Sequence, residues 1–349
     1  MELDVRRYVA VVAIGRNEGP RLEACLRSAR RELDHIVYVD SGSSDGSVEL
    51  ARAFGAETVE LDPARPFSAA RARNAGWRRV RSLAPAVRHV QFLDGDTELE
   101  PAWLEVAWDW LEGWPELAVV CGRRRERRRR ASVYNLICDM EWARPAGVNV
   151  ACGGDAMMRL AALTDVEGFD ETIIAGEEPE LCVRLWQRGW STLRVDAPMT
   201  THDADMNRFG EFWRRGVRAG HACAEAVARH GRGPTRHKRR ELASVLGWAV
   251  AWPALALLVA RRRPAAGGAM LLAYPLHAMW IAWRAREQGR ARSLGEGLIW
   301  ALACIVGRWA QVQGMARFVR GRLRGRCSGI IEYKPEARRR KGTVARSGG

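Results

Sequence analysis

The sequence predicts an α/β protein with a mostly parallel sheet, followed by a region of apolar helices. In the first two-thirds of the chain, short apolar and β-branched runs alternate with segments of helical periodicity, which is the order of a doubly wound parallel sheet. Acidic residues follow several of these runs, and the carboxyl edge of such a sheet is where ligands bind. The last third contains long uncharged stretches that are more apolar than an ordinary core helix.

The composition favours an anionic partner. The 349 residues carry a formal net charge of +15, which would attract nucleic acid, anionic lipid or a phosphorylated substrate. The eight cysteines form no C-x-x-C pair, so we expect neither a zinc site nor a disulfide framework, and we infer a reducing compartment. Residues 1–7 are charged and lead directly into an expected strand, so no signal peptide is expected.

The first two expected strands end in polar loops. Residues 8–14 are apolar and suit the centre of a sheet, and the loop after them lacks the G-x-G-x-x-G fingerprint of nicotinamide and flavin enzymes. Residues 34–39 lead to Asp40 in a loop rich in Ser and Gly, whose backbone N–H groups could approach an anion. Asp40 could accept hydrogen bonds from a base or a ribose. The alternative is a helix cap that needs no ligand.

A further strand, residues 90–93, runs directly into Asp94-Gly95-Asp96. Two carboxylates separated by a glycine are an unfavourable pair unless a cation joins them, and a divalent metal that carries phosphates is a suitable one. The alternative is a loop in which one aspartate caps the helix that begins near Pro101.

An arginine-rich run, residues 123–130, follows the strand expected at 117–121. A charge run is usually a solvated face. We therefore expect this run to face solvent or lipid rather than the catalytic site, although contact with a phosphorylated acceptor is an alternative.

Two further positions could carry chemistry. Glu177 and Glu178 stand at the mouth of a helix whose Leu181 and Leu185 face the core, and the helix N-terminus stabilises a carboxylate as the anion that a general base requires. The alternative is ordinary charge complementarity at a helix start. His202 follows the strand expected at 191–195 and is a candidate metal ligand, although a lone histidine there is more often structural.

Six motifs in a fixed order resemble the family 2 glycosyltransferases, which have the nucleotide-binding GT-A fold. The resemblance covers about the first two-thirds of the chain. The motifs are Asn17-Glu18, Asp40-Ser41-Gly42-Ser43-Ser44-Asp45, Arg73-Asn74-Ala75-Gly76, Asp94-Gly95-Asp96, Gly153-Gly154-Asp155 with Gly168-Phe169-Asp170-Glu171, and Gly176-Glu177-Glu178-x-Glu180-Leu181.

The resemblance implies a role for each motif. It implies a nucleotide-diphosphate sugar donor and Mg²⁺ or Mn²⁺ held by Asp96 and Asp94, with His202 completing the coordination. Glu178 would be the base that deprotonates an acceptor hydroxyl, or Glu177 would share that role, and one displacement gives inversion. The donor-binding residues would be Ile14, Arg16, Glu18, Asp40, Ser41, Arg73, Asn74, Asp94 and Gly95, and the acceptor side would include Gly154 and Asp155.

The sequence departs from the family pattern at three places. Glu178 and Glu180 stand where aspartate is usual. Ile14 and Arg16 replace the usual Pro and Tyr, which leaves the base-stacking contact open. The processive motif Gln-x-x-Arg-Trp is not evident, so we expect transfer of a single sugar.

The C-terminal third is expected to associate with a membrane. Residues 242–260 and 265–283 are uncharged and near the length of a spanning helix, whereas 294–318 looks amphipathic and interfacial. A simple two-pass hairpin would place the arginines at 261–263 on the far side, against the positive-inside tendency. Re-entrant or in-plane helices avoid that conflict by placing the arginines at anionic headgroups. The alternative is a helical core domain.

These expectations combine into one functional hypothesis. We expect a GT-A domain at 1–230, a membrane-associated helical region at 231–330 and a basic polar tail at 331–349. The chain would transfer one sugar to a hydroxyl acceptor, lipid-linked or membrane-proximal, at the cytoplasmic face of the inner membrane, with no nucleic-acid partner. The alternatives are a nucleic-acid-binding protein, which would interleave aromatic and basic residues on one surface, and a nucleotidyltransferase, which would need a Gly/Lys-rich loop after the first strand.

Overall fold

One mixed sheet forms the centre of the N-terminal domain. The computed structural model describes residues 5–149, 151–233 and 235–325. Its strands follow the order β3-β2-β1-β4-β8-β6-β9-β5, with β7 paired to β9. Their bounds are β1 (Val9–Gly15), β2 (Ile36–Asp40), β3 (Glu57–Glu60), β4 (His89–Asp94), β5 (Thr97–Leu99), β6 (Leu117–Glu126), β7 (Gly147–Val148), β8 (Ala156–Arg159) and β9 (Ser191–His202).

The sheet is parallel from β3 through β2 and β1 to β4, as expected from the alternation of strands and helices. The next strand, β8, runs antiparallel to both of its neighbours, β4 and β6. Beyond it, β6 and β9 are again parallel. The mostly parallel α/β fold predicted from the sequence is therefore confirmed, with antiparallel strands added in its second half.

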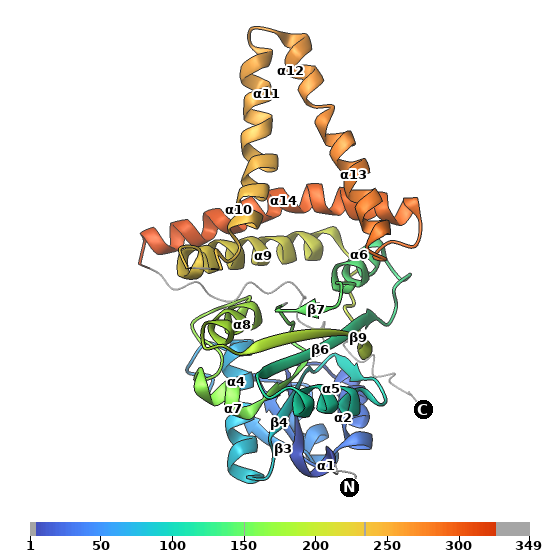
Figure 1. The fold of residues 1–349 in the computed structure, drawn as a ribbon, viewed down its shortest axis with the longest axis vertical. Coiled ribbons are helices and arrows are strands. Elements are labelled where there is room, and N and C mark those ends of the chain that lie inside the picture. Colours follow the sequence, from blue (N-terminus) through green and yellow to red (C-terminus); the bar gives the residue numbers. More distant parts are fainter. Residues whose placement is uncertain (1–4, 150, 234, 326–349) are drawn as a thin grey trace, which may run out of the picture.

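Helices cover the sheet and then continue as a separate layer (Figure 1). Those of the N-terminal domain are α1 (Val5–Tyr8), α2 (Pro20–Glu32), α3 (Ser47–Ala53), α4 (Ala69–Leu83), α5 (Trp103–Gly113), α6 (Val133–Trp142), α7 (Leu160–Asp165) and α8 (Glu177–Gln187). Those that follow are α9 (Phe209–His230), α10 (Arg239–Leu246), the π-helix η1 (Gly247–Ala251), α11 (Trp252–Ala260), α12 (Pro264–Met270), α13 (Ala273–Glu287) and α14 (Leu294–Leu323).

The core lies around the central strands. From Val9 to Ala13, β1 is fully buried, because helices cover both faces of the sheet there. On α4, Arg73, Trp77 and Val80 share the buried face at helical spacing, so the helix that packs on the sheet also directs Arg73 inward. This places an arginine near the carboxyl ends of β1 and β4.

Two strands are longer than the sequence predicted. The strand β6 does not end at Cys121 but continues to Glu126, so that Arg123, Arg124 and Arg125 lie within the sheet. The strand β9 continues beyond Val195 to His202. The expectation that the arginine run begins after a strand end is therefore wrong.

The helices after the sheet domain form a hairpin on a two-helix base. Figure 1 shows α9 and α14 side by side across the sheet domain, and the two legs of the hairpin projecting from the far side of that pair. The close packing of α9 on α14 requires glycine at 220, since a Cβ there would lie 2.0 Å from the carbonyl oxygen of Gln311. Although the predicted domain boundary at 230 remains a prediction, it would separate these two packed helices.

The hairpin legs are residues 239–260 and 264–287, both long and apolar enough to cross a membrane by length and composition. Residues 261–263 form the tip. The legs are tied together by Trp252, whose Nε1 donates to the carbonyl of Met270, and by Tyr274, whose hydroxyl donates to the carbonyl of Trp248. The two apolar stretches thus form a projecting hairpin rather than helices lying in one plane with α14, because these contacts pair them with each other. The predicted tail at 331–349 lies outside the described residues.

Candidate active site at the carboxyl edge of the sheet

Three predicted metal ligands meet at the ends of β4 and β9. One oxygen each from Asp94 and Asp96 and one ring nitrogen of His202 lie within 4.8 Å of one another. Nε2 of His202 is 3.2 Å from an oxygen of Asp96, and both side chains are buried. Backbone pairing of Thr97 with His202 brings the two segments together. Carboxylate oxygens and an imidazole form a donor set that suits Mn²⁺ and accommodates Mg²⁺.

Arg73 joins this cluster to the predicted base. Its Nη2 is 2.9 Å from Asp94, and its Nη1 is 2.9 Å from Glu177 and 3.1 Å from Glu178. The arginine side chain is only 2% exposed. Burial alone would lower the pKa of Arg73, but Glu178, Asp94 and Glu177 raise it above its ordinary value. The guanidinium is therefore a permanent cation between the candidate metal ligands and the two glutamates.

Gly154 makes this contact possible. A Cβ at that position would lie 2.6 Å from both Nη2 of Arg73 and one carboxylate oxygen of Asp94. The sequence assigned Gly154 to the acceptor side through the family resemblance. Its position here shows a second requirement, which is space for the ion pair between Arg73 and Asp94.

The two glutamates begin α8, with Gly176 as the N-cap residue. The side chain of Glu177 is 5% exposed and that of Glu178 is 14% exposed, so Glu178 is the more accessible of the two. Burial and then the neighbouring Glu177 raise the pKa of Glu178 to about 7, while Arg73 lowers it. Desolvation therefore opposes the stabilisation of the anion that the helix N-terminus is expected to provide.

Asp155 holds the candidate metal ligands in place through buried contacts. It is fully buried, accepts a hydrogen bond from the backbone N–H of Asp94 at 3.1 Å and accepts another from Thr200 at 2.8 Å. Arg124 lies 2.7 Å from the same carboxylate and 3.7 Å from Asp94. The sequence assigned Asp155 to the acceptor side. In the structure, its carboxylate binds the backbone of Asp94 and pairs with Arg124.

Arg124 and Trp142 are site residues that the sequence analysis missed. The Arg124 guanidinium lies 5.5 Å from the ring centroid of Trp142, and that ring lies 4.6 Å from the ring of His202. The expectation of a solvent- or lipid-facing arginine run is wrong for Arg124, because β6 directs it toward the site. It is also wrong for Arg129, which pairs with Asp139 and with Glu296 of α14. The available signal was the alternation of β6, in which Arg124 and Glu126 share a face.

The predicted nucleotide loops lie beside β1 and β2 and bind each other. Asn17 donates its backbone N–H to Ser43 at 2.9 Å and accepts from the N–H of Ser44 at 2.8 Å. The buried Asp40 accepts from the N–H groups of Gly42 and Ser43, both at 2.8 Å. These contacts close a turn rather than cap a helix, because α3 begins only at Ser47 with Gly46 as its N-cap residue, and a role of Asp40 in reading a base or ribose stays a prediction.

Most of the other residues predicted to bind the sugar donor contact neighbouring parts of the protein. Ile14 and Ser41 place the loops: the carbonyl of Ile14 accepts from Gly95, and Ser41 donates its N–H to Gly15. Glu18 pairs with Arg21 at 2.8 Å.

Asn74 lies away from the donor loops. It donates to the carbonyl of Phe169 at 2.8 Å and accepts from the N–H of Phe169 at 2.9 Å, which holds the turn at Gly168. Arg16 is exposed, and its guanidinium lies 5.7 Å from the ring centroid of Phe67. Phe67, which the sequence analysis did not single out, thus places an aromatic ring beside the loop at which the usual Tyr is missing.

Comparison with known proteins agrees with this geometry. Residues 10–150 match the profile of glycosyl transferase family 2. The glycosyltransferase AglE of Haloferax volcanii is 25% identical over 231 residues, which cover 61% of this chain and 72% of AglE. A TPR repeat-containing protein of Synechococcus elongatus is 32% identical over 110 residues, and this match spans only 23% of that protein.

A solved structure extends the likeness beyond the sheet domain. The mannosyltransferase PcManGT of Pyrobaculum calidifontis, in complex with GDP-Man and Mn²⁺, has a TM-score of 0.60 and 19% identity. The match covers 90% of this chain and 87% of PcManGT. The fold predicted from the sequence is thereby confirmed, and the family profile matches the part of the chain in which the first four predicted motifs lie.

Proposed function

We propose, on the premise that residues 10–150 form a family 2 glycosyltransferase domain of the GT-A fold, that this chain transfers one sugar from a nucleotide-diphosphate sugar to a hydroxyl acceptor with inversion. The observation that carries the proposal is the position of Arg73. Its single guanidinium contacts Asp94 of the metal cluster and both glutamates at the start of α8. The groups that would hold the leaving diphosphate and the group that would deprotonate the acceptor therefore belong to one connected site.

Asp94, Asp96 and His202 are the residues that would hold Mg²⁺ or Mn²⁺. When bound, the ion would supply positive charge that neutralises the leaving diphosphate. The Mn²⁺ in the complex of the structurally similar PcManGT supports this assignment. Arg73 and Arg124 hold Asp94 on its two sides, so the carboxylate is oriented before any ligand binds.

Glu178 is the proposed general base. It is more exposed than Glu177, and a pKa near 7 lets it exist as a carboxylate at neutral pH and still accept a proton. It would take the proton from the acceptor hydroxyl at a carboxylate oxygen while that hydroxyl attacks the anomeric carbon. Attack from the face opposite the diphosphate gives inversion in one displacement. Glu177 remains in its ion pair with Arg73.

The hairpin supports a membrane-proximal acceptor, which we propose to be lipid-linked. Leu257 and Leu276, on opposite legs, are 69% and 67% exposed, which is costly in water and favourable in lipid. Arg239 and Arg240 begin one leg, and Arg284 and Arg286 end the other, so positive charge surrounds the base on the side of the sheet domain. We propose that the sheet domain lies at the cytoplasmic face of the inner membrane, with the positive charge at the hairpin base as support, and that the arginines of the tip, residues 261–263, contact anionic headgroups.

The test is a screen of purified full-length protein against a panel of nucleotide sugars with Mn²⁺, Mg²⁺ or EDTA. We expect one or a few donors to bind and to be hydrolysed or transferred in a metal-dependent way. The anomeric configuration of the product, followed by NMR, reports inversion or retention. Failure of every donor to bind with either metal would remove the proposed activity, and a retained configuration would remove the single-displacement mechanism.

A further inference from the structure

The base of the hairpin holds a cation among aromatic rings. Arg308 of α14 donates from Nη1 to Nε2 of His277 on α13 at 3.1 Å. Its guanidinium lies 5.9 Å from the ring centroid of Trp248 on η1. The rings of Trp248 and His277 stack, with centroids 4.0 Å apart and 7° between their planes, and Trp280 stacks with His277 in turn. Three helices therefore meet around one guanidinium.

Arg308 differs from Arg73 and Arg129 in its partners. Across the ranges that the structure describes, no carboxylate forms an ion pair with it, and its hydrogen-bond partner is an imidazole. By contrast, Arg129, which lies beside the first turn of α14, is paired with two carboxylates. A cation in apolar surroundings is costly without a counter-charge, and in a membrane region such a residue indicates a functional site.

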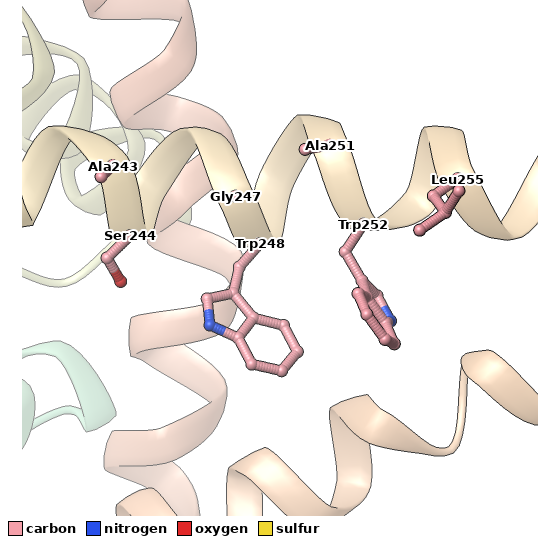
Figure 2. A pocket seen from close by; sticks show the side chains of 7 residues that line it. All are labelled: Ala243, Ser244, Gly247, Trp248, Ala251, Trp252 and Leu255. Atoms are coloured by element: carbon pink, nitrogen blue, oxygen red, sulfur yellow. The ribbon is translucent and has the colours of Figure 1, made fainter.

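A groove includes the same tryptophan in its lining. It has a volume of about 330 Å³ and follows the leg formed by α10, η1 and α11. Figure 2 shows Trp248 and Trp252 pointing to the same side of this leg, with Leu255 farther along it. The volume is at the lower end of the range for ligand pockets, and the lining is almost entirely apolar. Trp248 is the side chain that the groove shares with the Arg308 cluster.

The depth of the cluster suits a lipid headgroup. Trp248 follows Arg239, the first residue of α10, by about two and a half helical turns. Tyr274, Trp280 and Trp309 lie in the same layer, with Tyr274 and Trp309 stacked. Tryptophan and tyrosine concentrate where the headgroups meet the hydrocarbon, which is also the depth of the lipid phosphate.

We infer that this cluster binds one anionic phospholipid, whose phosphate accepts hydrogen bonds from Arg308 and whose acyl chain lies in the groove. The inference rests on the membrane location proposed above. The occupant is anionic because the only charged group of the cluster is the guanidinium, and it is a lipid because the groove lined by Trp248, the ring beside that guanidinium, is apolar. Basic pockets between membrane helices are a known means of binding such headgroups.

The experiment titrates the full chain, in a mild non-ionic detergent, with phosphatidylglycerol or phosphatidylcholine and counts bound lipid by native mass spectrometry. We expect the wild type to retain one phosphatidylglycerol in preference to phosphatidylcholine. Arg308→Met should weaken phosphatidylglycerol binding by roughly tenfold or more, because a charge-assisted hydrogen bond is lost. The matched control is Arg317→Met, an exposed arginine on the same helix, which should bind like the wild type.

A second pair of variants tests the groove without touching the cation. Ala251→Trp fills the groove from an exposed position and should weaken binding of both lipids, whereas the neighbouring Val250→Trp, outside the lining, should not. If Arg308→Met does not fold, this pair of variants still tests whether a lipid occupies the groove. Equal effects within either pair, or equal affinity of the wild type for the two lipids, would overturn the site. Flotation of the wild type with phosphatidylcholine vesicles tests the membrane location separately, and a chain that does not float removes both proposals.

Discussion

Two inward-facing arginines, Arg73 at the sheet edge and Arg308 at the hairpin base, show two different uses of a cation. Arg73 contacts three carboxylates from β4 and α8 at 2.9–3.1 Å. Arg308 contacts an imidazole and an indole face, with no carboxylate partner among the described residues. The first cation is satisfied before any ligand binds, whereas the second still lacks a counter-charge.

The different partners of the two arginines follow from what the sheet edge and the hairpin base each require. At the sheet edge, the carboxylates must be held in place, and paired charges provide that preorganisation without a ligand. The removal of Arg73 would leave three carboxylates close together in a buried site. At the hairpin base, the protein supplies only one charge, so removal of Arg308 would delete an interaction with a ligand and leave no buried charge unpaired. The chemistry should therefore depend on the sheet edge alone.

The largest expected effect is on the chemical step. Glu178→Gln preserves the shape of the side chain but removes the proton acceptor, so kcat should fall by roughly 10²–10⁴-fold while binding of the nucleotide sugar survives. The measurement is release of nucleoside diphosphate from the donor identified in the screen, with donor affinity from calorimetry. Glu105→Gln, an exposed change on α5, is the control. Turnover at the wild-type rate would remove Glu178 as the base, and a loss confined to Glu177→Gln would transfer the role to that residue.

The next prediction compares the two arginines directly. Arg73→Met leaves buried carboxylates without their cation and should lower the free energy of unfolding by about 3–5 kcal/mol. Arg308→Met replaces a cation by an apolar side chain in an apolar setting and should change it by less than about 1 kcal/mol. Urea unfolding in mild detergent, followed by near-ultraviolet circular dichroism, measures both. Similar losses in the two variants would contradict the distinction between a satisfied and an unsatisfied cation.

The sequence predicted those parts of the site that depend on local order. Asp94-Gly95-Asp96 directly after an apolar strand predicted a candidate metal site at the sheet edge, and His202, predicted as a third ligand, lies beside the two aspartates. The parallel half of the sheet followed from the alternation of strands and helices. These features depend on neighbours in the chain, so a single sequence contains them.

The features that were missed depend on distant packing. Arg124 enters the site only because β6 continues past Cys121 and pairs with the long β9. Glu178 has a raised pKa because the start of α8 is buried, with Ala222 of α9 within 3.4 Å of a Cβ placed on Gly176. The pairing of the two apolar stretches with each other was not predicted, because the hydrogen bonds that join the legs connect residues 18 and 26 positions apart. No local pattern carries this information.

A smaller effect is expected on metal affinity. His202→Ala removes one of three donors and should raise the Mn²⁺ concentration for half-maximal activity by roughly tenfold or more, since ligand and supporting residues each contribute to affinity at this scale. Direct binding of Mn²⁺, measured by electron paramagnetic resonance, separates affinity from activity. The exposed His35→Ala is the control. If Mn²⁺ binding by His202→Ala equals that of the wild type, the histidine is structural, and the metal cluster consists of the two aspartates.

The smallest effect is a pH dependence that only the sheet edge should show. Burial and Glu177 raise the pKa of Glu178 to about 7, and the base must be deprotonated to act, so kcat/KM should fall by about tenfold per pH unit below this value and level off above it. The same shift predicts that ionisation of Glu178, between its unfolded pKa and about 7, disfavours the folded state as the pH rises. Residual activity of Glu178→Gln should lack the acidic limb, whereas Arg308→Met should retain it unchanged. An acidic limb that persists in Glu178→Gln would mean that another group, with Glu177 as the nearest candidate, controls the profile.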